Sequence, residues 1–324
     1  TAESSTNAHQ TEFNFVDTMI PILNPAGVQE MIDYGLHGFA MSRFAGTWAA
    51  LKCVKDNVES TASVDAGLDR LKIILPDFAM PPGGLNIRAN DLDFLGQEIR
   101  LHEYKRDAAS AYIRANGLNR MIYSGGANAK VGILTVGKNY LDVRQALDDL
   151  GIDEARANQI GVRLFKVACP WPFDLADMAE FVDGLEMVIV VEEKRSLLES
   201  QLREALYGGA RQPVVVGKRD ERGDWLFPVK GALDPNDIAV AVGERLLKVI
   251  GYSEDIDAKV KRIRQFQSML ASVSDVASRT PYFCSGCPHN TSTKVPEGSI
   301  AAAGIGCHFM SLWMDRDTTG FTQM

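Results

Sequence analysis

Three cysteines near the end of the chain have the residue type and spacing of a metal or cluster site. Cys284 and Cys287 form a Cys-x2-Cys pair, and Cys307 follows twenty residues after that pair. Two thiolates three positions apart can bind one ion or one cluster when a tight turn points both sulfurs the same way, and Gly286 permits such a turn. A third thiolate from a second loop is a common complement.

Spacing alone leaves three interpretations of these cysteines open. A [4Fe-4S] cluster needs four thiolates, and only three are close in sequence. A zinc site could take His289 or His308 as a fourth ligand, although a zinc ribbon usually has two Cys-x2-Cys knuckles. The third interpretation is three unliganded cysteines in a buried loop. The other two, Cys53 and Cys169, lie in apolar sequence and are predicted to be buried.

Two weaker patterns could also bind a ligand. Gly304 and Gly306 would let backbone amides approach a phosphate, although a simple tight turn explains such glycines more often. Glu192 and Glu193 follow an apolar run, at the position where open sheets bind ligands, but acidic residues also suit the first turn of a helix. We favour a solvated helix start for this pair. No Gly-x-Gly-x-x-Gly and no Walker sequence occurs, so a nicotinamide site and a P-loop are not supported.

Apolar runs that alternate with amphipathic stretches predict an α/β fold with a parallel sheet flanked by helices. The expected strands cover 130–136, 162–167, 187–191 and 214–216, and the expected helices cover 140–150, 172–182, 194–207 and 238–250. Before this region the sequence predicts a helix over 25–34, short strands at 50–54 and 71–75, a loop at 81–84 and helix over 91–116. A charged helical connector is expected over 253–279.

Composition is that of a globular protein without nucleic-acid or membrane partners. The 324 residues are 46% apolar and 23% charged, with a net charge of −8 and no basic stripe. No run of 18 apolar residues predicts a membrane span. Five cysteines are too few for a disulfide scaffold and fit a reducing cytoplasm. The polar start without a methionine, together with the ending over 320–324, predicts a piece of a longer protein.

Several segments resemble one enzyme family. Residues 282–293 (YFCSGCPHNTST), 304–308 (GIGCH) and 313–316 (WMDR) are similar to the thiamine-diphosphate domain of indolepyruvate ferredoxin oxidoreductase in its long fused bacterial form. Upstream, 4–10, 21–30 and 58–62 resemble the later part of that family's pyrimidine-binding domain. Segments 132–138, 170–172 and 191–194 resemble its transketolase C-terminal-like domain. The resemblance covers essentially the whole chain.

The resemblance implies parallel sheets flanked by helices in thiamine-enzyme (transketolase-like) domains. Its boundaries are the later part of the pyrimidine-binding domain over 1–90, a helical linker over 91–120, the transketolase C-terminal-like domain over 121–253, a connector over 254–279 and the start of the diphosphate-binding domain over 280–324. The middle domain is expected to be a scaffold.

The resemblance also implies an activity. Members oxidatively decarboxylate an arylpyruvate on thiamine diphosphate with magnesium, pass electrons through iron–sulfur clusters to ferredoxin, and transfer the acyl group to coenzyme A. A homodimer in the cytoplasm is expected, because such enzymes bind the cofactor between two domains, often across chains. The alternative is a zinc-stabilised α/β interaction module without catalysis.

Site residues carry over from the family motifs position by position. The metal ligands of the [4Fe-4S] cluster match Cys284, Cys287 and Cys307. The cofactor-binding residues match His289 and the loop Ile305, Gly306 and His308. The fourth cluster cysteine, the Gly-Asp-Gly motif for magnesium and diphosphate, and the acidic residue that activates thiamine have no match, so no catalytic residue is assigned. This chain alone is therefore expected to be inactive and to lack a stable cofactor site.

Overall fold

The largest element of the computed structural model is a five-stranded sheet with the order β3-β5-β4-β6-β7. The structure describes residues 10–67, 69–87, 93–209, 212–272, 280–304 and 306–321. Strands β4 (Val131–Val136), β5 (Val162–Val167), β6 (Met187–Val191) and β7 (Val214–Val216) are parallel, and β3 (Arg120–Tyr123) is an antiparallel edge strand. Residue 131 pairs with 162 on one side and with 187 on the other.

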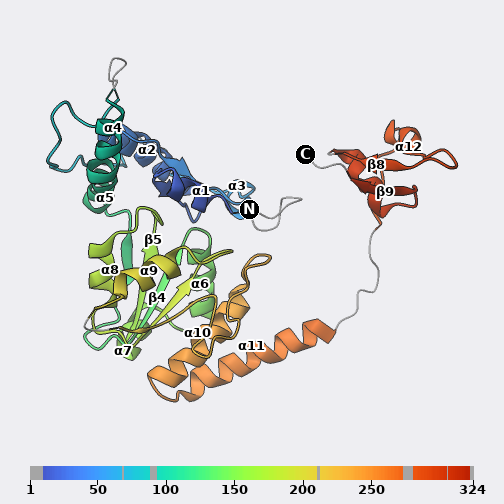
Figure 1. Ribbon diagram of the computed structural model, residues 1–324. Helices are drawn as coiled ribbons and strands as arrows, with labels where there is room; N and C mark the ends of the chain where they lie inside the picture. The colour runs from blue at the N-terminus through green and yellow to red at the C-terminus, as the bar shows by residue number, and fades with distance from the viewer. Residues whose placement is uncertain are drawn as a thin grey trace. The chain divides into compact units, whose positions relative to one another are not determined.

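Helices cover both faces of this sheet (Figure 1). Helices α6 (Asn139–Asp149) and α10 (Pro235–Val249) pack on the face that carries Ile133 and Ile189. Helices α8 (Leu175–Val182) and α9 (Leu198–Leu206) pack on the opposite face, against Leu134, Val188 and Val190. Every residue of β4 and β6 is buried, which explains why these strands are unbroken apolar runs rather than alternating ones. Helix α7 (Glu154–Ile160) lies between α6 and β5 in the chain.

The N-terminal segment packs against the carboxyl ends of the sheet strands. It contains α1 (Glu12–Asp17), β1 (Ile22–Leu23), α2 (Val28–Ala45), β2 (Ala50–Leu51), α3 (Lys55–Val58), α4 (Phe94–Arg100), a π-helical turn over Leu101–Lys105 and α5 (Arg106–Ala115). Helices α2 and α5 share a core that includes Met41, Tyr112 and Cys169. The backbone amide of Ile22 donates to the Trp171 carbonyl at 2.8 Å, and that of Asn24 to the Ala168 carbonyl at 2.8 Å, which joins β1 to the loop after β5.

A salt bridge between α2 and the sheet also fixes the N-terminal segment. The Lys166 ammonium on β5 pairs with the Glu30 carboxylate and lies 4.4 Å from the centroid of the Tyr140 ring. Burial lowers the pKa of Lys166, although Glu30 acts in the opposite direction. Glu30 also accepts from the Ala26 amide at 2.8 Å and from Arg120 at 3.1 Å.

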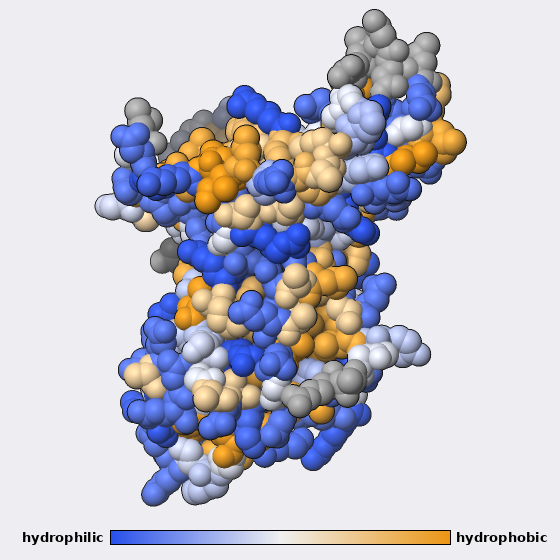
Figure 2. All heavy atoms as spheres, turned by 90° about the vertical axis from the view of Figure 1, so that its left-hand side faces the viewer, coloured by the Kyte–Doolittle hydropathy of each residue, from blue (hydrophilic) through white to orange (hydrophobic). Residues whose placement is uncertain are grey.

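Large apolar side chains remain exposed in the N-terminal segment. Figure 2 shows apolar surface in the upper part of the view. The exposed residues are Leu36, Phe39, Trp48, Ile74, Leu75, Ile87 and Phe94. Large apolar side chains that stay exposed in number on one segment often mark a region that contacts another part of a protein or a partner.

The predicted α/β class is confirmed, with four corrections in the elements. The antiparallel strand β3 and helix α7 were missed, because both are short and polar in part. Residues 71–75 form no strand; this segment is held by Ile74, whose backbone pairs with the Asn116 side chain at 2.8 Å. The helix expected over 25–34 begins at Val28 and continues to Ala45. The domain boundaries drawn from the family resemblance stay a prediction.

Two compact units make up the chain, Thr1–Gln267 and Ser268–Met324. Helix α11 (Glu254–Ser272) runs across that boundary. The second unit contains α12 (His289–Ser292), β8 (Ala301–Ala303), a 3-10 helix over Cys307–Trp313 and β9 (Thr318–Phe321), and β8 and β9 pair in parallel. Across the described residues, no helix combines the length and apolarity needed to cross a bilayer.

Candidate functional site

The Cys-x2-Cys segment forms the tight turn that its spacing predicts. The Cys287 amide donates to the Cys284 carbonyl at 3.0 Å, and Gly286 between them has φ of +76°. The Asn290 side chain donates to the same carbonyl at 3.1 Å, which fixes the turn against the start of α12. Only a residue without a Cβ adopts this backbone conformation at low cost.

The structure brings His289 and His308 together. Their ring centroids are 5.6 Å apart, and the centroid of the Phe283 ring lies 5.4 Å from that of His289. Both histidines line a pocket of ≈ 350 Å³ that is also bounded by β8 and the 3-10 helix. Gly306 has φ of +119°, and a Cβ there would lie 3.3 Å from the His308 ring. Ile305, which the family motif also predicts to be in the site, falls outside the described residues.

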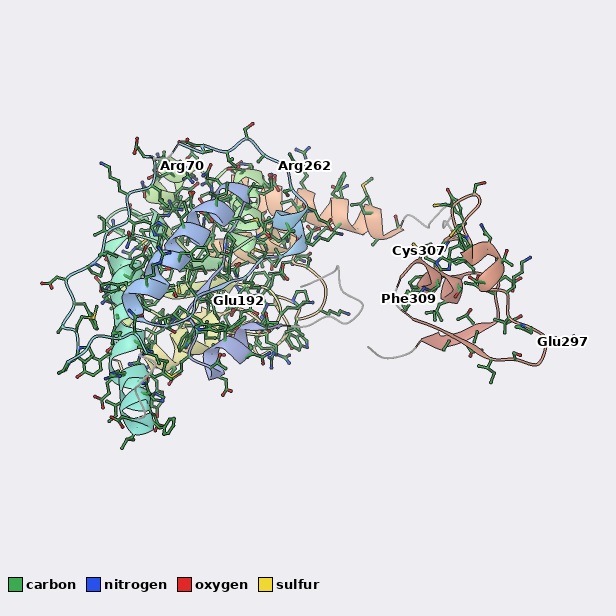
Figure 3. All side chains as sticks on the ribbon, turned by 90° about the horizontal axis from the view of Figure 1, so that it is seen from above. Arg70, Glu192, Arg262, Glu297, Cys307 and Phe309 are labelled. Carbon is green, nitrogen blue, oxygen red and sulfur yellow. The ribbon has the colours of Figure 1, made fainter. Side chains whose placement is uncertain are left out.

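The three cysteines have the right chemistry for a cluster but form an incomplete set. Cys284 and Cys307 are exposed and Cys287 is half-buried, and none forms a disulfide. Figure 3 shows Cys307 in the second unit, where it is the first residue of the 3-10 helix that also contains Phe309. Within the described ranges no three His, Cys, Asp or Glu side chains are grouped to hold a metal ion. Three thiolates also fall one short of the four that a [4Fe-4S] cluster takes.

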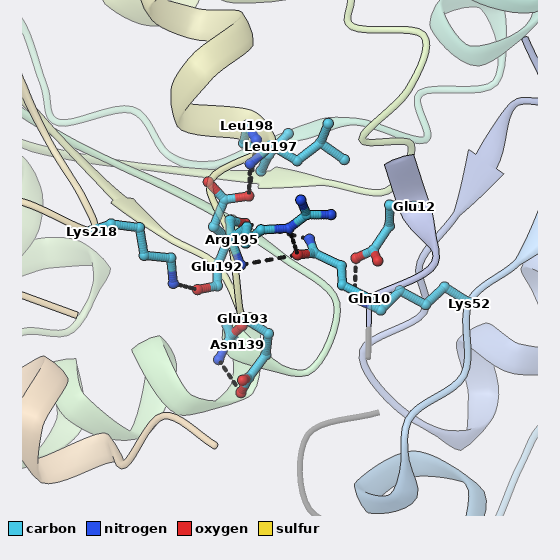
Figure 4. Close-up of polar contacts among 10 residues, drawn as sticks. All are labelled: Gln10, Glu12, Lys52, Asn139, Glu192, Glu193, Arg195, Leu197, Leu198 and Lys218. Atoms are coloured by element: carbon cyan, nitrogen blue, oxygen red, sulfur yellow. Dashed lines mark hydrogen bonds and ion pairs between the residues drawn. The ribbon is translucent and has the colours of Figure 1, made fainter. Parts of the chain in front are cut away.

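Glu192 caps a helix, as predicted, but it is buried rather than solvated. Its carboxylate accepts the backbone amides of Leu197 and Leu198 at 2.9 Å and of Glu199 at 3.0 Å, at the start of α9. Its carbonyl accepts from the Lys218 ammonium. Burial raises the pKa of Glu192, and the three amides act against that rise. The sequence predicted a solvated helix start here, and that prediction is wrong. Glu192 is buried because the loop after β6 packs its carboxylate against the first backbone amides of α9 (Figure 4).

Glu193 does not cap the helix. It lies instead beside charged residues that the sequence did not single out. It lies near Lys138 at the end of β4, and Glu12 and Lys52 of the N-terminal segment line the same pocket. A signal for Lys138 was present in the sequence. Like Glu193, it comes two residues after the end of an unbroken apolar strand, and the carboxyl ends of adjacent parallel strands meet at one edge of a sheet.

Comparisons with known proteins agree over most of the chain. A family model described as "Indolepyruvate oxidoreductase domain" matches residues 121–270. The subunit IorA of indolepyruvate oxidoreductase from Pyrococcus abyssi is 24% identical over 320 residues, which are 95% of this chain and 45% of that protein. IorA from Thermococcus kodakarensis is 28% identical over 193 residues, 58% of this chain and 27% of that protein.

The chain is therefore similar to indolepyruvate oxidoreductase subunits over most of its length, and the family model covers its middle part, residues 121–270. It spans less than half the length of the curated relatives it matches. Among solved structures, 2-oxoglutarate:ferredoxin oxidoreductase from Magnetococcus marinus matches 70% of this chain and 42% of that chain, with a TM-score of 0.43 and 16% identity. A split-gene transketolase matches 41% of this chain and 42% of its own, with a TM-score of 0.28.

Proposed function

We propose that this chain is part of a longer thiamine-diphosphate-dependent enzyme, a 2-oxoacid:ferredoxin oxidoreductase that acts on an arylpyruvate such as indolepyruvate. The observation that carries the proposal is the family relationship, because relatives named for indolepyruvate oxidation align with 95% of the chain. The exposed apolar surface of the N-terminal segment also supports a longer protein, since such surface is usually covered.

The proposed reaction converts the 2-oxoacid, coenzyme A and two oxidised ferredoxins into acyl-coenzyme A, carbon dioxide, two reduced ferredoxins and a proton. When bound, thiamine diphosphate supplies the electron sink for the decarboxylation. In this chain Gly306 leaves its backbone open to a diphosphate, because it has no side chain and holds a φ that other residues rarely adopt. His289, His308 and the neighbouring Ile305 complete the proposed cofactor-binding set.

Cys284, Cys287 and Cys307 are the proposed ligands of a [4Fe-4S] cluster. Two of these thiols are exposed, so they are accessible to a cluster and to a fourth thiolate from elsewhere in the longer protein. No residue here is proposed for magnesium, because the Gly-Asp-Gly motif is missing from the sequence. We accordingly propose that the 324 residues alone are inactive, and that the longer protein works as a homodimer in the cytoplasm.

Metal analysis of the longer protein, purified without oxygen, tests the site. The proposal predicts iron and acid-labile sulfide in equal amounts, and loss of the cluster absorbance in Cys284→Ala. Cys169→Ala is the matched control, because that thiol is buried in the core of the first unit, and it should keep the iron. Stoichiometric zinc without iron would instead support a zinc-stabilised module and overturn the proposal.

A further inference from the structure

Helix α2 is apolar on two opposite faces. Its inner face, which includes Tyr34 and Met41, is buried in the core that it shares with α5. On the other side Ile32, Leu36 and Phe39 are 39%, 47% and 70% exposed. Their spacing of four and three residues places them in one stripe along the helix, the outer stripe of α2. A helix that is apolar all round is normally buried, so the outer stripe is expected to be covered.

An apolar groove borders the outer stripe. It has a volume of ≈ 600 Å³ and lies between α2 and the irregular segment over 73–86. Most of its lining is apolar and comes from both sides: Ala40, Phe44, Ile73, Leu75, Met80 and Leu85. Because Ala40 follows Phe39 directly on the helix, the outer stripe and the groove form one surface. We call this surface the docking surface.

A single cation on the docking surface narrows the class of occupant. Arg43 lines the groove one turn of helix after the outer stripe, and it has no ion-pair partner in the part of the chain that the structure describes. Both carboxylates of α2 are already used, since Asp33 pairs with Arg70 and Glu30 pairs with Lys166. A second copy that packed its α2 on this α2 would therefore bring no free carboxylate to Arg43.

The length of the relatives indicates where the occupant comes from. The 320 residues that align with IorA from Pyrococcus abyssi are only 45% of that protein, so more than half of it lies outside the aligned part. The distance along α2 from Ile32 to Arg43 is about 16 Å, enough for roughly three turns of a second helix. Helices commonly pack into apolar grooves of this kind with one face apolar.

We propose that an amphipathic helix from the remaining part of the longer protein packs along the docking surface. Its apolar face covers the outer stripe and the groove, and one of its aspartates or glutamates pairs with Arg43. This inference rests on the longer protein proposed above, but it concerns assembly and not the oxidoreductase reaction.

Hydroxyl-radical footprinting, read by mass spectrometry on the 324-residue chain and on the longer protein, tests the proposal. Phe39 and Met80 should be modified severalfold more slowly in the longer protein, because covered side chains lose contact with the solvent. Tyr207 is the control: it is 89% exposed at the end of α9, and it should react equally in both proteins. The measurement needs no substrate or cofactor. A longer protein that protects Phe39 but lacks the activity would therefore contradict only the proposed function.

Phe39→Gln tests the same contact by its effect on stability. In the 324-residue chain it replaces an exposed side chain and should leave the melting temperature unchanged. In the longer protein it should lower the melting temperature by roughly 5–10 °C, because it places an amide in an apolar contact. Arg43→Gln should cause a smaller decrease there, because the carboxylate of the occupant loses its cation. Tyr207→Gln, the matched control, should change neither protein.

Three outcomes would overturn the proposal. The first is equal modification of Phe39 in both proteins. The second is a Phe39→Gln variant of the longer protein that loses no more stability than Tyr207→Gln. The third is a 324-residue chain that dimerises in light scattering and protects Phe39 by itself, since the occupant would then be a second copy. If the longer Phe39→Gln protein cannot be isolated, the footprint of the unaltered protein decides alone.

Discussion

The buried pair of Lys166 and Glu30 should be a major contributor to the attachment of the N-terminal segment. Lys166 has a side chain only 2% exposed, and Glu30 is 17% exposed. Replacing Glu30 by alanine leaves a buried ammonium without its carboxylate and removes the acceptor of the Ala26 amide at 2.8 Å. Breaking one side of a buried ion pair costs about 3–5 kcal/mol, which is the expected loss in the free energy of unfolding.

The reciprocal change should cost much less. Lys166→Met removes the buried charge and keeps a chain of similar length against the Tyr140 ring, while Glu30 retains the Ala26 amide and Arg120. We expect a loss of about 1 kcal/mol or less. In the double variant the methionine should restore most of the stability that Glu30→Ala loses.

Urea unfolding followed by circular dichroism measures these differences, with Lys130→Met as the control. Lys130 pairs with Glu186 at 2.9 Å, but both side chains are about half exposed. That surface pair should contribute less than about 1 kcal/mol. The reasoning is refuted if Glu30→Ala loses no more stability than Lys130→Met, or if Lys166→Met is the more damaging variant of the pair.

Three other buried positions give predictions of their own. His37 bonds to the Tyr112 hydroxyl at 3.0 Å, and burial lowers its pKa from 6.5, so the unfolded chain takes up the proton first and stability should fall as the pH drops below about 6.5. Urea midpoints at pH 7.5 and 5.5 check this, and His37→Gln should flatten the difference. Glu192→Ala should cost roughly 2–4 kcal/mol and speed hydrogen exchange at the start of α9, because three amides lose their acceptor; unchanged exchange there would contradict the capping role. In Gly132→Ala the new Cβ would lie 2.5 Å from the Leu185 side chain, so thermal unfolding should show a loss of roughly 1–3 kcal/mol, and a neutral result would mean that β4 shifts freely.

The sheet was predictable because its strands are buried on both faces. Four unbroken apolar runs gave the strands nearly to the residue, and β6 matches Met187–Val191. The antiparallel strand β3 was not predictable in the same way, because its Arg-Met-Ile-Tyr sequence has only one buried residue. The strand predicted over 71–75 does not form, although its sequence is apolar. The backbone of Ile74 pairs with the side chain of Asn116 and not with another strand.

The candidate site was predictable where the signal is local. A glycine between two cysteines specifies the turn at Gly286, and the structure has that turn. The closeness of His289 and His308 required the packing of two loops, and only the family motif suggested it. The pocket at Glu12 and Glu193 joins residues 181 positions apart, so spacing in the sequence carried no sign of it.

The most direct test of the proposed function is the arylpyruvate-dependent reduction of ferredoxin by the longer protein that contains this chain. Anaerobic assays would supply indolepyruvate, coenzyme A and thiamine diphosphate with magnesium, and would follow ferredoxin bleaching. The account predicts reduction that requires both the 2-oxoacid and coenzyme A and that is lost in Cys287→Ser. The account would be contradicted if the iron-loaded protein failed to reduce ferredoxin with every 2-oxoacid tested, both aromatic and aliphatic.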